Sequence, residues 1–166
     1  METDESITAA GTQYLTFDLA DERYAVEVAS VEVVLESSVV TRVPKSPAHM
    51  RGVINHRGSV VPVVDLRAVF GIDRAESDAD ASIIVAQVAF EGENITAGIL
   101  ADAVQEVVDI EKDSVEPPPS FGSRVDGAFI KGIGRREGQF VILLDLERAL
   151  SGAQAATVTQ RANDRE

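Results

Sequence analysis

One unit of sequence occurs twice in the chain, and this duplication constrains the fold more than any other feature. The first copy, RGVINHRGSVVPVVDL, runs from Arg51 to Leu66, and the same skeleton returns from Lys131 to Leu146 as KGIGRREGQFVILLDL. Each copy sets two glycines around a short segment, continues as an apolar strand, and ends in Asp-Leu before a short helical pattern. An internal repeat of this kind indicates an architecture built from two similar halves.

The apolar residues elsewhere in the chain recur with the two-residue period of β-strands. Residues 82–110 repeat the order of residues 13–35, a hairpin followed by a valine-rich run, so the duplication extends beyond the opening unit. No helical pattern is longer than about two turns. We therefore predict an all-β fold of two small barrels with only short helical turns. Strands are expected at residues 13–20, 24–28, 31–35, 39–43, 59–64, 82–90, 95–100, 104–110, 129–133 and 139–144, with a hairpin loop at Gly134–Gly138.

Each half is too short to be stable alone. A unit of roughly 65–70 residues buries only a small core, so the two barrels should share a core or an interface. We expect one domain over residues 13–150, with a first barrel within 13–72 and a second within 80–150, allowing for an exchange of strands between them. Residues 1–12 are predicted to be a disordered tail and residues 151–166 a frayed one.

Composition excludes several classes of protein. The chain of 166 residues has no cysteine, which rules out disulfides and thiolate metal sites. Its net charge of −13 argues against nucleic acid and anionic membrane surfaces as partners. The first residues carry no apolar signal segment, and no apolar run approaches the roughly 18 residues of a membrane span. We expect a soluble cytoplasmic protein that does not insert into a membrane.

Charge is spread unevenly along the chain. Residues 41–74 carry six basic side chains and two acidic ones, whereas the segments on either side of them are strongly acidic. One interpretation is a local basic docking face. The other is that these bases balance neighbouring acids within the fold, and the sequence leaves both open.

The aspartates that end the two repeated units, Asp65 and Asp145, also admit two interpretations. Each can cap the helical turn that follows it. Alternatively, the pair could be the catalytic carboxylates of a β-barrel hydrolase, which requires both acids to lie within reach of each other. Capping is the simpler explanation, because each aspartate precedes Leu and a charged residue where an aspartic-protease site needs small residues.

The two histidines, His49 and His56, lie seven residues apart in a segment without cysteine. A metal site would need further ligands, which Asp65 or Glu36 could supply, but no spacing recommends it. We expect exposed loop histidines, no bound metal, no cofactor and no enzymatic activity.

The segments described above resemble the CheW family, the coupling proteins of prokaryotic chemotaxis. The resemblance covers residues 13–150 and rests on YLTFDLADERYAVEV, TRVP, SPAHMRGVINHRGSVVPVVDLRAVFG, AGILADAVQEVVDI and IKGIGRREGQFVILLDLERAL. It implies two five-stranded SH3-like barrels around a shared core, and a scaffold without enzymatic activity. The partners it implies are the cytoplasmic tips of methyl-accepting chemoreceptors and the CheW-like regulatory domain of the histidine kinase CheA. It also implies recruitment to membrane-associated receptor arrays, with weak self-association.

The resemblance further implies two binding surfaces. In the related domains the receptor tip is bound in the groove between the barrels. Carried over by position, the receptor-binding candidates are Val31, Gly52, Asn55, Arg57, Gly58, Gly98 and Val104. A kinase-binding surface is expected on the exposed apolar edge of the second barrel and on the hairpin Gly134–Gly138, with Gly134, Arg135 and Gln139 as candidates.

The sequence departs from the family pattern beside Arg57. Val33 stands where members often carry an acid that can pair with this arginine, so Arg57 needs Glu32, Glu36 or a receptor acid instead. Two roles for Arg57 stay open, an internal ion pair that positions its loop and a direct receptor contact.

Two further positions differ as well. His56 stands where an apolar residue is common, and Glu137 replaces Arg57 in the second copy of the repeat, so the two halves are not functionally equivalent. A parallel receptor–kinase pathway that controls pili or development remains an alternative to chemotaxis.

Overall fold

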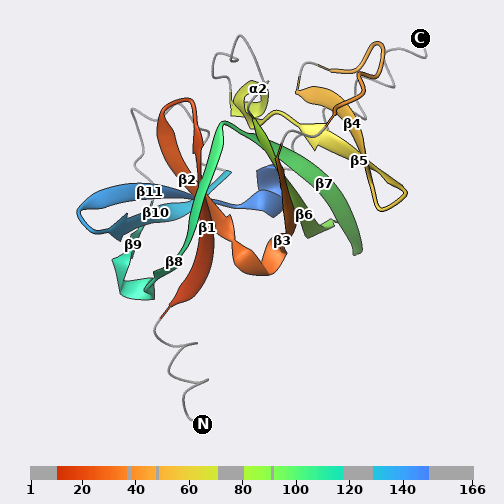
Figure 1. Ribbon diagram of the computed structural model, residues 1–166. Coiled ribbons are helices and arrows are strands. Elements are labelled where there is room, and N and C mark those ends of the chain that lie inside the picture. Colours follow the sequence, from red (N-terminus) through yellow and green to blue (C-terminus); the bar gives the residue numbers. More distant parts are fainter. Residues whose placement is uncertain are drawn as a thin grey trace.

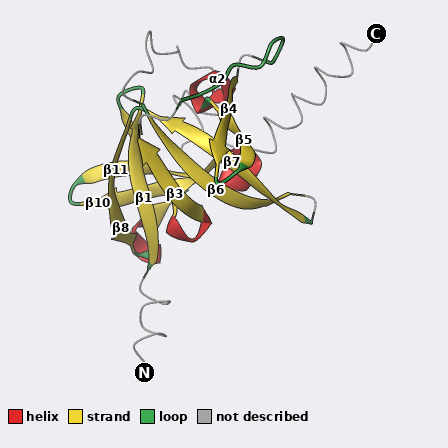
Figure 2. Cartoon of the chain, turned by 45° about the vertical axis from the view of Figure 1, so that its right-hand side comes forward, coloured by secondary structure: helices red, strands yellow, loops and turns green. Residues whose placement is uncertain are grey.

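The structure is a computed structural model that describes residues 11–36, 39–47, 49–70, 81–90, 92–117 and 129–149. The expected linker at residues 72–80 and tail at 151–166 lie outside these residues. So does most of the expected N-terminal tail, although Thr12 already begins the first strand. Strands dominate the described chain, and its helices are short (Figure 2). The predicted all-β class is confirmed.

The first half of the fold is a six-stranded sheet, which curls at the left of Figure 1. Two of its strands come from the start of the chain, and the other four come from residues 103–144. In spatial order the strands are β8 (Ala103–Ile110), β1 (Thr12–Leu19), β2 (Glu22–Glu27), β11 (Gln139–Leu144), β10 (Ile130–Arg136) and β9 (Val115–Glu116).

The second half is a five-stranded sheet at the right of Figure 1. Its strands in spatial order are β3 (Val31–Glu36), β6 (Ser82–Phe90), β7 (Glu93–Ala101), β5 (Ser59–Val64) and β4 (Met50–His56). Beyond the outer edge of β4, Thr41 forms an isolated antiparallel bridge with Val53. The short helical elements are η1 (Val28–Ser30), α2 (Leu66–Phe70) and η2 (Lys112–Ser114).

Strands are exchanged between the two halves of the chain. The β1–β2 hairpin lies in the six-stranded sheet, where β2 runs parallel to β11. The β6–β7 hairpin lies in the five-stranded sheet, where β7 runs parallel to β5. Neither sheet therefore corresponds to one continuous half of the chain, and the exchange of strands that the sequence allowed for is present. Each repeated hairpin packs beside a hairpin that the other half of the chain supplies.

The two sheets enclose a shared core between them, and each sheet also encloses a smaller core of its own. The shared core joins buried residues of both sheets, including Phe17 and Leu144 from one and Ile84 and Ile99 from the other. Two smaller clusters fill the individual barrels. They consist of Tyr14, Ala25, Val108, Ile110, Val141 and Leu143 in the six-stranded sheet, and of Ile54, Val61, Val63, Ile83, Val85 and Leu100 in the five-stranded sheet. This arrangement of paired barrels matches the predicted fold class.

A row of four aromatic rings runs through the shared core. Phe17 stacks on Tyr24 with ring centroids 6.0 Å apart, Tyr24 on Phe70 at 6.2 Å, and Phe70 packs against Phe129 at 5.7 Å. Phe70 comes from α2, so the short helix after Asp65 packs its apolar side onto the junction of the sheets. Offset aromatic pairs of this kind add about 0.5–1.5 kcal/mol each beyond the burial of their area.

The repeated hairpins have the same register. In β4–β5 the pairing shifts between Met50 and Gly52, and in β10–β11 it shifts between Ile130 and Gly132, so each has a bulge at the equivalent position. Each hairpin closes with two residues, as Arg57-Gly58 and Glu137-Gly138, which all have positive φ. Two positive values define the type I′ turn, whose twist matches that of the flanking strands.

Three sequence predictions on local structure were wrong. No strand was expected at residues 50–56, which form β4. A strand was expected at residues 39–43, but only Thr41 pairs, through its bridge to Val53. A five-residue loop was expected at Gly134–Gly138, but β10 continues to Arg136. Gly134 is buried in the strand, where a Cβ atom would lie 3.2 Å from the Ile110 side chain. The glycine therefore leaves room for the barrel interior and does not mark a turn.

Candidate functional site

The tip of the β4–β5 hairpin presents a polar and basic surface. Asn55, Arg57 and Gly58 are all exposed. The side-chain oxygen of Asn55 accepts a hydrogen bond from the Gly58 N–H at 2.9 Å, which fixes the turn. The Arg57 side chain is 76% exposed, so most of its guanidinium is available to a partner.

Glu32 on β3 connects this hairpin to the far edge of the same sheet. Its carboxylate lies 3.8 Å from the Arg57 guanidinium and 3.4 Å from Nε2 of His56, and it accepts a hydrogen bond from Gln87 at 3.3 Å. Because β3 and β4 are the two outer strands of the five-stranded sheet, these contacts close the sheet into a barrel. The departure at Val33 is thus compensated by the neighbouring Glu32.

The expectation of exposed histidines was wrong. His49 is 9% exposed, and the His56 side chain is 12% exposed. Nε2 of His56 is buried and, within the described chain, makes no hydrogen bond, although the Glu32 carboxylate lies near it. The barrel closure that buries His56 joins segments distant in sequence, so local composition did not reveal it. Among the described residues, no three His, Cys, Asp or Glu side chains are grouped to hold a metal ion.

Val31 and Val104 occupy equivalent places in the two sheets. Val31 begins β3 and pairs with Ala86, and Val104 in β8 pairs with Phe17, each next to a shift in register. Both are half-buried and pack against the shared core. They therefore expose part of an apolar side chain where the two barrels meet.

Gly52 and Gly98 are buried, in contrast to the other receptor-binding candidates. A Cβ atom on Gly52 would lie 2.2 Å from the Thr41 carbonyl oxygen, and one on Gly98 would lie 2.8 Å from Ile83. Neither glycine can touch a partner through a side chain. Any effect of these positions on binding is exerted through the shape of β4 and β7.

The β10–β11 hairpin presents the principal exposed apolar residue of the six-stranded sheet. Phe140 is 62% exposed, and the Arg135 guanidinium lies 5.8 Å from the centre of its ring. Arg135 also pairs with Glu116 on β9, and Gln139 is exposed beside it. Of the three kinase-binding candidates, Arg135 and Gln139 thus lie on one surface with Phe140, whereas Gly134 is buried. Sequence reasoning missed Phe140 as a named residue.

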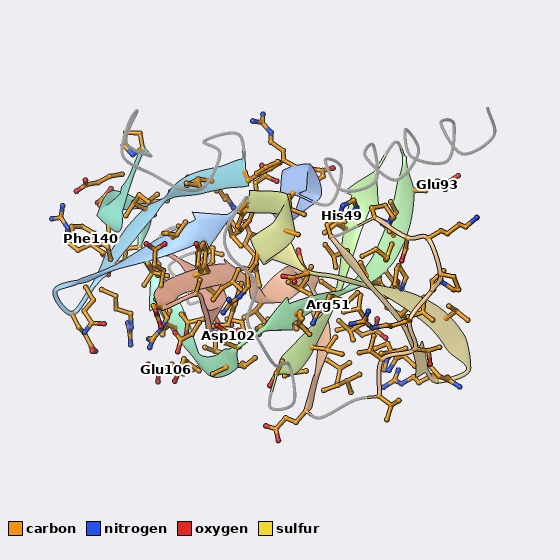
Figure 3. All side chains as sticks on the ribbon, turned by 90° about the horizontal axis from the view of Figure 1, so that it is seen from above. His49, Arg51, Glu93, Asp102, Glu106 and Phe140 are labelled. Carbon is orange, nitrogen blue, oxygen red and sulfur yellow. The ribbon has the colours of Figure 1, made fainter. Side chains whose placement is uncertain are left out.

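The equivalent residue of the other hairpin is Val60, which is 74% exposed. Val60 and Phe140 both lie at the second position after their turn, in strands with the same burial pattern. The β4–β5 and β10–β11 hairpins extend to opposite ends of the molecule (Figure 1). Seen from above, Phe140 likewise lies on the opposite side from His49 (Figure 3). The molecule therefore carries two separate tips of similar geometry and different chemistry.

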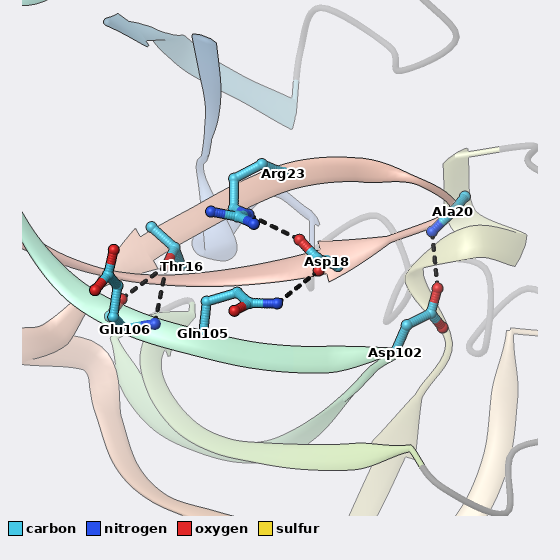
Figure 4. A network of polar contacts seen from close by, with 7 residues as sticks. All are labelled: Thr16, Asp18, Ala20, Arg23, Asp102, Gln105 and Glu106. Atoms are coloured by element: carbon cyan, nitrogen blue, oxygen red, sulfur yellow. Dashed lines mark hydrogen bonds and ion pairs between the residues drawn. The ribbon is translucent and has the colours of Figure 1, made fainter. Parts of the chain in front are cut away.

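A polar network joins β8 to the β1–β2 hairpin at the seam of the six-stranded sheet (Figure 4). The buried Thr16 hydroxyl donates to the Glu106 carbonyl at 2.8 Å and accepts from the Glu106 N–H at 3.1 Å, which satisfies the backbone at the shift in register. Asp18 accepts from Gln105 at 2.7 Å and pairs with Arg23. The Gln105–Asp18 hydrogen bond is the counterpart of the Gln87–Glu32 hydrogen bond in the other sheet. The amide lies on β8 and the acid on β1 in the first pair, whereas the acid lies on β3 and the amide on β6 in the second.

Both repeated aspartates cap the helical turns that follow them. The Asp65 carboxylate accepts a hydrogen bond from the Arg67 N–H at 3.0 Å, and that of Asp145 accepts one from the Arg148 N–H at 3.1 Å. Asp65 is buried, and this burial raises its pKa above the ordinary 3.8, while the N–H and the charge of Arg67 act in the opposite direction. The capping predicted from the sequence is confirmed for both residues.

A cavity of about 350 Å³ lies where the two sheets meet. It is bordered by Glu27 and Lys131 of the six-stranded sheet and by Gln87 and Val88 of β6. None of the seven receptor-binding candidates lines it, although Ser30 on its rim is adjacent to Val31. The predicted candidates thus lie in three groups: the half-buried valines at the barrel junction, the exposed tip of β4–β5, and the two buried glycines Gly52 and Gly98.

Paired curled sheets, two exposed hairpin tips and capped, structural aspartates define a class of protein-interaction module. No helix among the described residues is long and apolar enough to span a bilayer. The CheW-like domain family matches residues 13–154, and the chain belongs to this family. The predicted recognition is confirmed.

Relatives of known name agree with this assignment over nearly their whole length. The chain is 31% identical to a probable chemotaxis protein CheW of Rhizobium etli, over 91% of this chain and 95% of that protein. It is 30% identical to the chemotaxis protein CheW of Klebsiella aerogenes, over 89% and 87%. The crystal structure of the scaffolding protein TtCheW from Thermoanaerobacter tengcongensis superposes with a TM-score of 0.74 at 33% identity, covering 84% of this chain and 92% of that one.

Proposed function

We propose that the protein is a non-enzymatic adaptor that couples chemoreceptors to the histidine kinase CheA in chemotaxis signalling. The observation that carries this proposal is the pair of exposed hairpin tips at opposite ends of the molecule, Arg57 with Val60 and Arg135 with Phe140. An adaptor must hold two partners at once, and two separate surfaces of different chemistry allow this. The names of the family relatives support the pathway.

The receptor side is proposed to be the β4–β5 tip together with the junction of the barrels. Asn55, Arg57 and Gly58 are exposed there and can contact an acidic or polar receptor tip directly. Val31 and Val104 offer partly exposed apolar surface next to the shared core. Arg57 serves both of its predicted roles, because the long contact to Glu32 leaves most of its guanidinium donors free for a receptor carboxylate.

The kinase side is proposed to be the β10–β11 tip. Phe140 has the properties of an interface anchor, since it is aromatic, largely exposed and flanked by an arginine. The kinase's regulatory domain is itself CheW-like in the related systems, so a contact of barrel with barrel would bury this tip. In this view Arg135 and Gln139 form the polar rim around Phe140.

The proposed location follows from the proposed partners. The chain would work in the cytoplasm and be recruited to membrane-associated chemoreceptor arrays through the receptor-side surface. Weak self-association in such arrays would use the same hairpin tips.

Binding of each partner alone tests this proposal. Isothermal titration calorimetry with the regulatory domain of the cognate kinase and with a receptor cytoplasmic-tip fragment is expected to show binding of both. Phe140→Ser is expected to weaken kinase binding at least about tenfold, as loss of an interface anchor does, and to leave receptor binding unchanged. Val60→Ser is the matched control, because it makes a similar change at the equivalent place on the other hairpin. Failure of the wild-type chain to bind either partner would contradict the proposal.

A further inference from the structure

We infer that a pocket beside β4 binds an acidic segment of a partner protein. The pocket has a volume of about 340 Å³ and lies between the loop at residues 42–47 and the start of β4. We call it the basic pocket, and its lining consists of Arg42, Val43, Pro44, Lys45, Ser46, Pro47, Met50 and Arg51. The receptor-side and kinase-side candidates do not line it, so the proposed function leaves it unexplained.

The charge of the basic pocket is opposite to that of the molecule. Among the described residues, three cationic side chains line it and no acidic one does, in a chain with 28 acidic and 15 basic residues. Most described basic side chains elsewhere are paired with acids, as in Arg67–Asp102 and Lys131–Glu27. Arg42 and Lys45 form no salt bridge with a described residue. The bases of residues 41–74 therefore balance neighbouring acids in part only, and Arg42 and Lys45 supply a local docking face.

The basic pocket also has an apolar component. Val43 is 42% exposed, Pro44 is exposed, and Met50 and Pro47 are half-buried beside them. Carboxylates of a bound segment would meet the cations, and an apolar side chain between them would cover this apolar surface. Such a combination fits an extended peptide with acidic residues around an apolar one better than it fits a free inorganic anion.

The pocket loop is fixed by hydrogen bonds before any ligand binds. Thr41 exchanges two backbone hydrogen bonds of 2.8 Å with Val53, and the Ser46 hydroxyl donates to the Val43 carbonyl at 2.6 Å. The Met50 N–H donates to the Pro47 carbonyl at 3.0 Å. Gly52 permits the close approach of Thr41 to β4. A loop held in this way loses little conformational freedom on binding, which favours affinity.

Fluorescence anisotropy with a defined peptide tests this inference. The probe is a labelled decapeptide of Glu and Asp residues around a central Leu, compared with the same peptide carrying Gln and Asn. The acidic peptide is expected to bind, and the neutral peptide to bind at least about tenfold more weakly, because the charge-assisted contacts are lost. Chemical shift changes in an amide NMR spectrum should concentrate in residues 41–53.

Two double variants distinguish binding at the basic pocket from a general effect of positive charge. Arg42→Gln/Lys45→Gln is expected to lower the affinity for the acidic peptide at least about tenfold. Lys112→Gln/Arg148→Gln removes the same charge from exposed sites away from the pocket, and is expected to leave the affinity unchanged. Val43→Ser tests the apolar component and should weaken binding without changing the charge. Thermal unfolding followed by circular dichroism confirms that each variant is folded.

Several results would overturn the inference. These are a failure of the acidic peptide to bind, an equal loss in both double variants, or shift changes that lie outside the pocket. Binding of phosphatidylglycerol vesicles through Arg42 and Lys45 in preference to the peptide would assign the pocket to a membrane surface instead. The peptide assay needs neither receptor nor kinase, so its outcome is independent of the proposed adaptor function.

Discussion

The guanidinium of Arg57 lies 3.8 Å from the carboxylate of Glu32, which ties the tip of the β4–β5 hairpin to the outer strand on the far side of the same sheet. An exposed pair of this length contributes at most about 1 kcal/mol to stability. Arg57 also has a φ of 55°, in the left-handed region that disfavours side chains other than Gly, Asn and Asp. An exposed pair of this kind adds little to folding, and we therefore propose that the guanidinium of Arg57 serves binding.

The first prediction concerns this strain. Arg57→Asn is expected to raise the free energy of unfolding by about 0.5–1 kcal/mol, because asparagine tolerates positive φ and favours the first position of a type I′ turn. The same variant should weaken binding of a receptor fragment at least about tenfold, through loss of the guanidinium. Urea unfolding and calorimetry measure the two quantities.

Glu137→Asn is the matched control for Arg57→Asn. Glu137 has a φ of 50° at the equivalent position of the β10–β11 hairpin, so the gain in stability should be similar. Receptor binding should not change. If Arg57→Asn bound receptor as well as the wild type, or if both variants lost receptor binding equally, the role given to Arg57 would be wrong.

The second prediction ranks two glycines of the β4–β5 hairpin. Gly52→Ala should lower the free energy of unfolding by about 3 kcal/mol or more, because the new methyl group would meet the Thr41 backbone at a positive φ of 148°. Gly58→Ala should cost only about 1 kcal/mol, because its φ is positive but the space around it is open. Urea titration of the two variants checks the order, and equal losses would show that contact with Thr41 is unimportant.

The third prediction concerns the pH dependence of stability at Asp65. Since burial raises the pKa of Asp65 above 3.8, the unfolded chain releases this proton at a lower pH than the folded chain does. The contribution of Asp65 to stability is thus fully present below 3.8 and declines as the pH rises through the raised folded value. Asp65→Asn keeps the capping oxygen and cannot ionise. The free energy of unfolding of Asp65→Asn, relative to that of the wild type, should therefore increase as the pH rises from 3.8 through the raised folded pKa of Asp65, and then level off.

Unfolding free energies of both proteins at a series of pH values on either side of 3.8 provide the test. Asp65→Ala serves as the second variant. Since neither alanine nor asparagine ionises, it should be about 1 kcal/mol less stable than Asp65→Asn at every pH, because the cap is absent. A constant difference between wild type and Asp65→Asn over the whole range would show that burial does not perturb this carboxyl group.

The fourth prediction follows from the net charge of −13. Repulsion among the excess acidic groups should destabilise the folded chain at low ionic strength, and added salt screens this repulsion. The midpoint of thermal unfolding is expected to rise as sodium chloride is added from low to high concentration. A flat profile would indicate that the paired bases already neutralise the acidic surface.

The strand content and the repeat could be read from the sequence because they depend on local patterns. The two-residue period of residues 13–20 and the Asp-Leu ends of the repeated unit correspond to β1 and to two capped helical turns. The pairing of sheets could not be read in this way. The parallel contact of β2 with β11 joins segments more than one hundred residues apart. From the apolar pattern alone, the β1–β2 hairpin could pair with β5 as well as with β11.

The sequence predicted which residue types belong to the candidate site better than it predicted which of them are exposed. The exposure of Arg57 and its link to Glu32 agree with what the residues suggested. The low exposure of the His56 side chain did not follow from the sequence, because the Glu32 carboxylate beside it comes from β3, which is distant along the chain. Phe140 was not named as a candidate, because it belongs to an apolar run that is typical of a buried strand. Its exposure follows from its position, the second residue after a two-residue turn.

The central claim is that one molecule joins a receptor to the kinase through two separate surfaces. Sedimentation velocity of the chain with a receptor-tip fragment and the kinase's regulatory domain, first in pairs and then together, tests it most directly. We predict a ternary complex in which Arg57→Ala releases only the receptor fragment and Phe140→Ser releases only the kinase domain. Mutually exclusive binding of the two partners, or their joint release by either substitution, would contradict the claim.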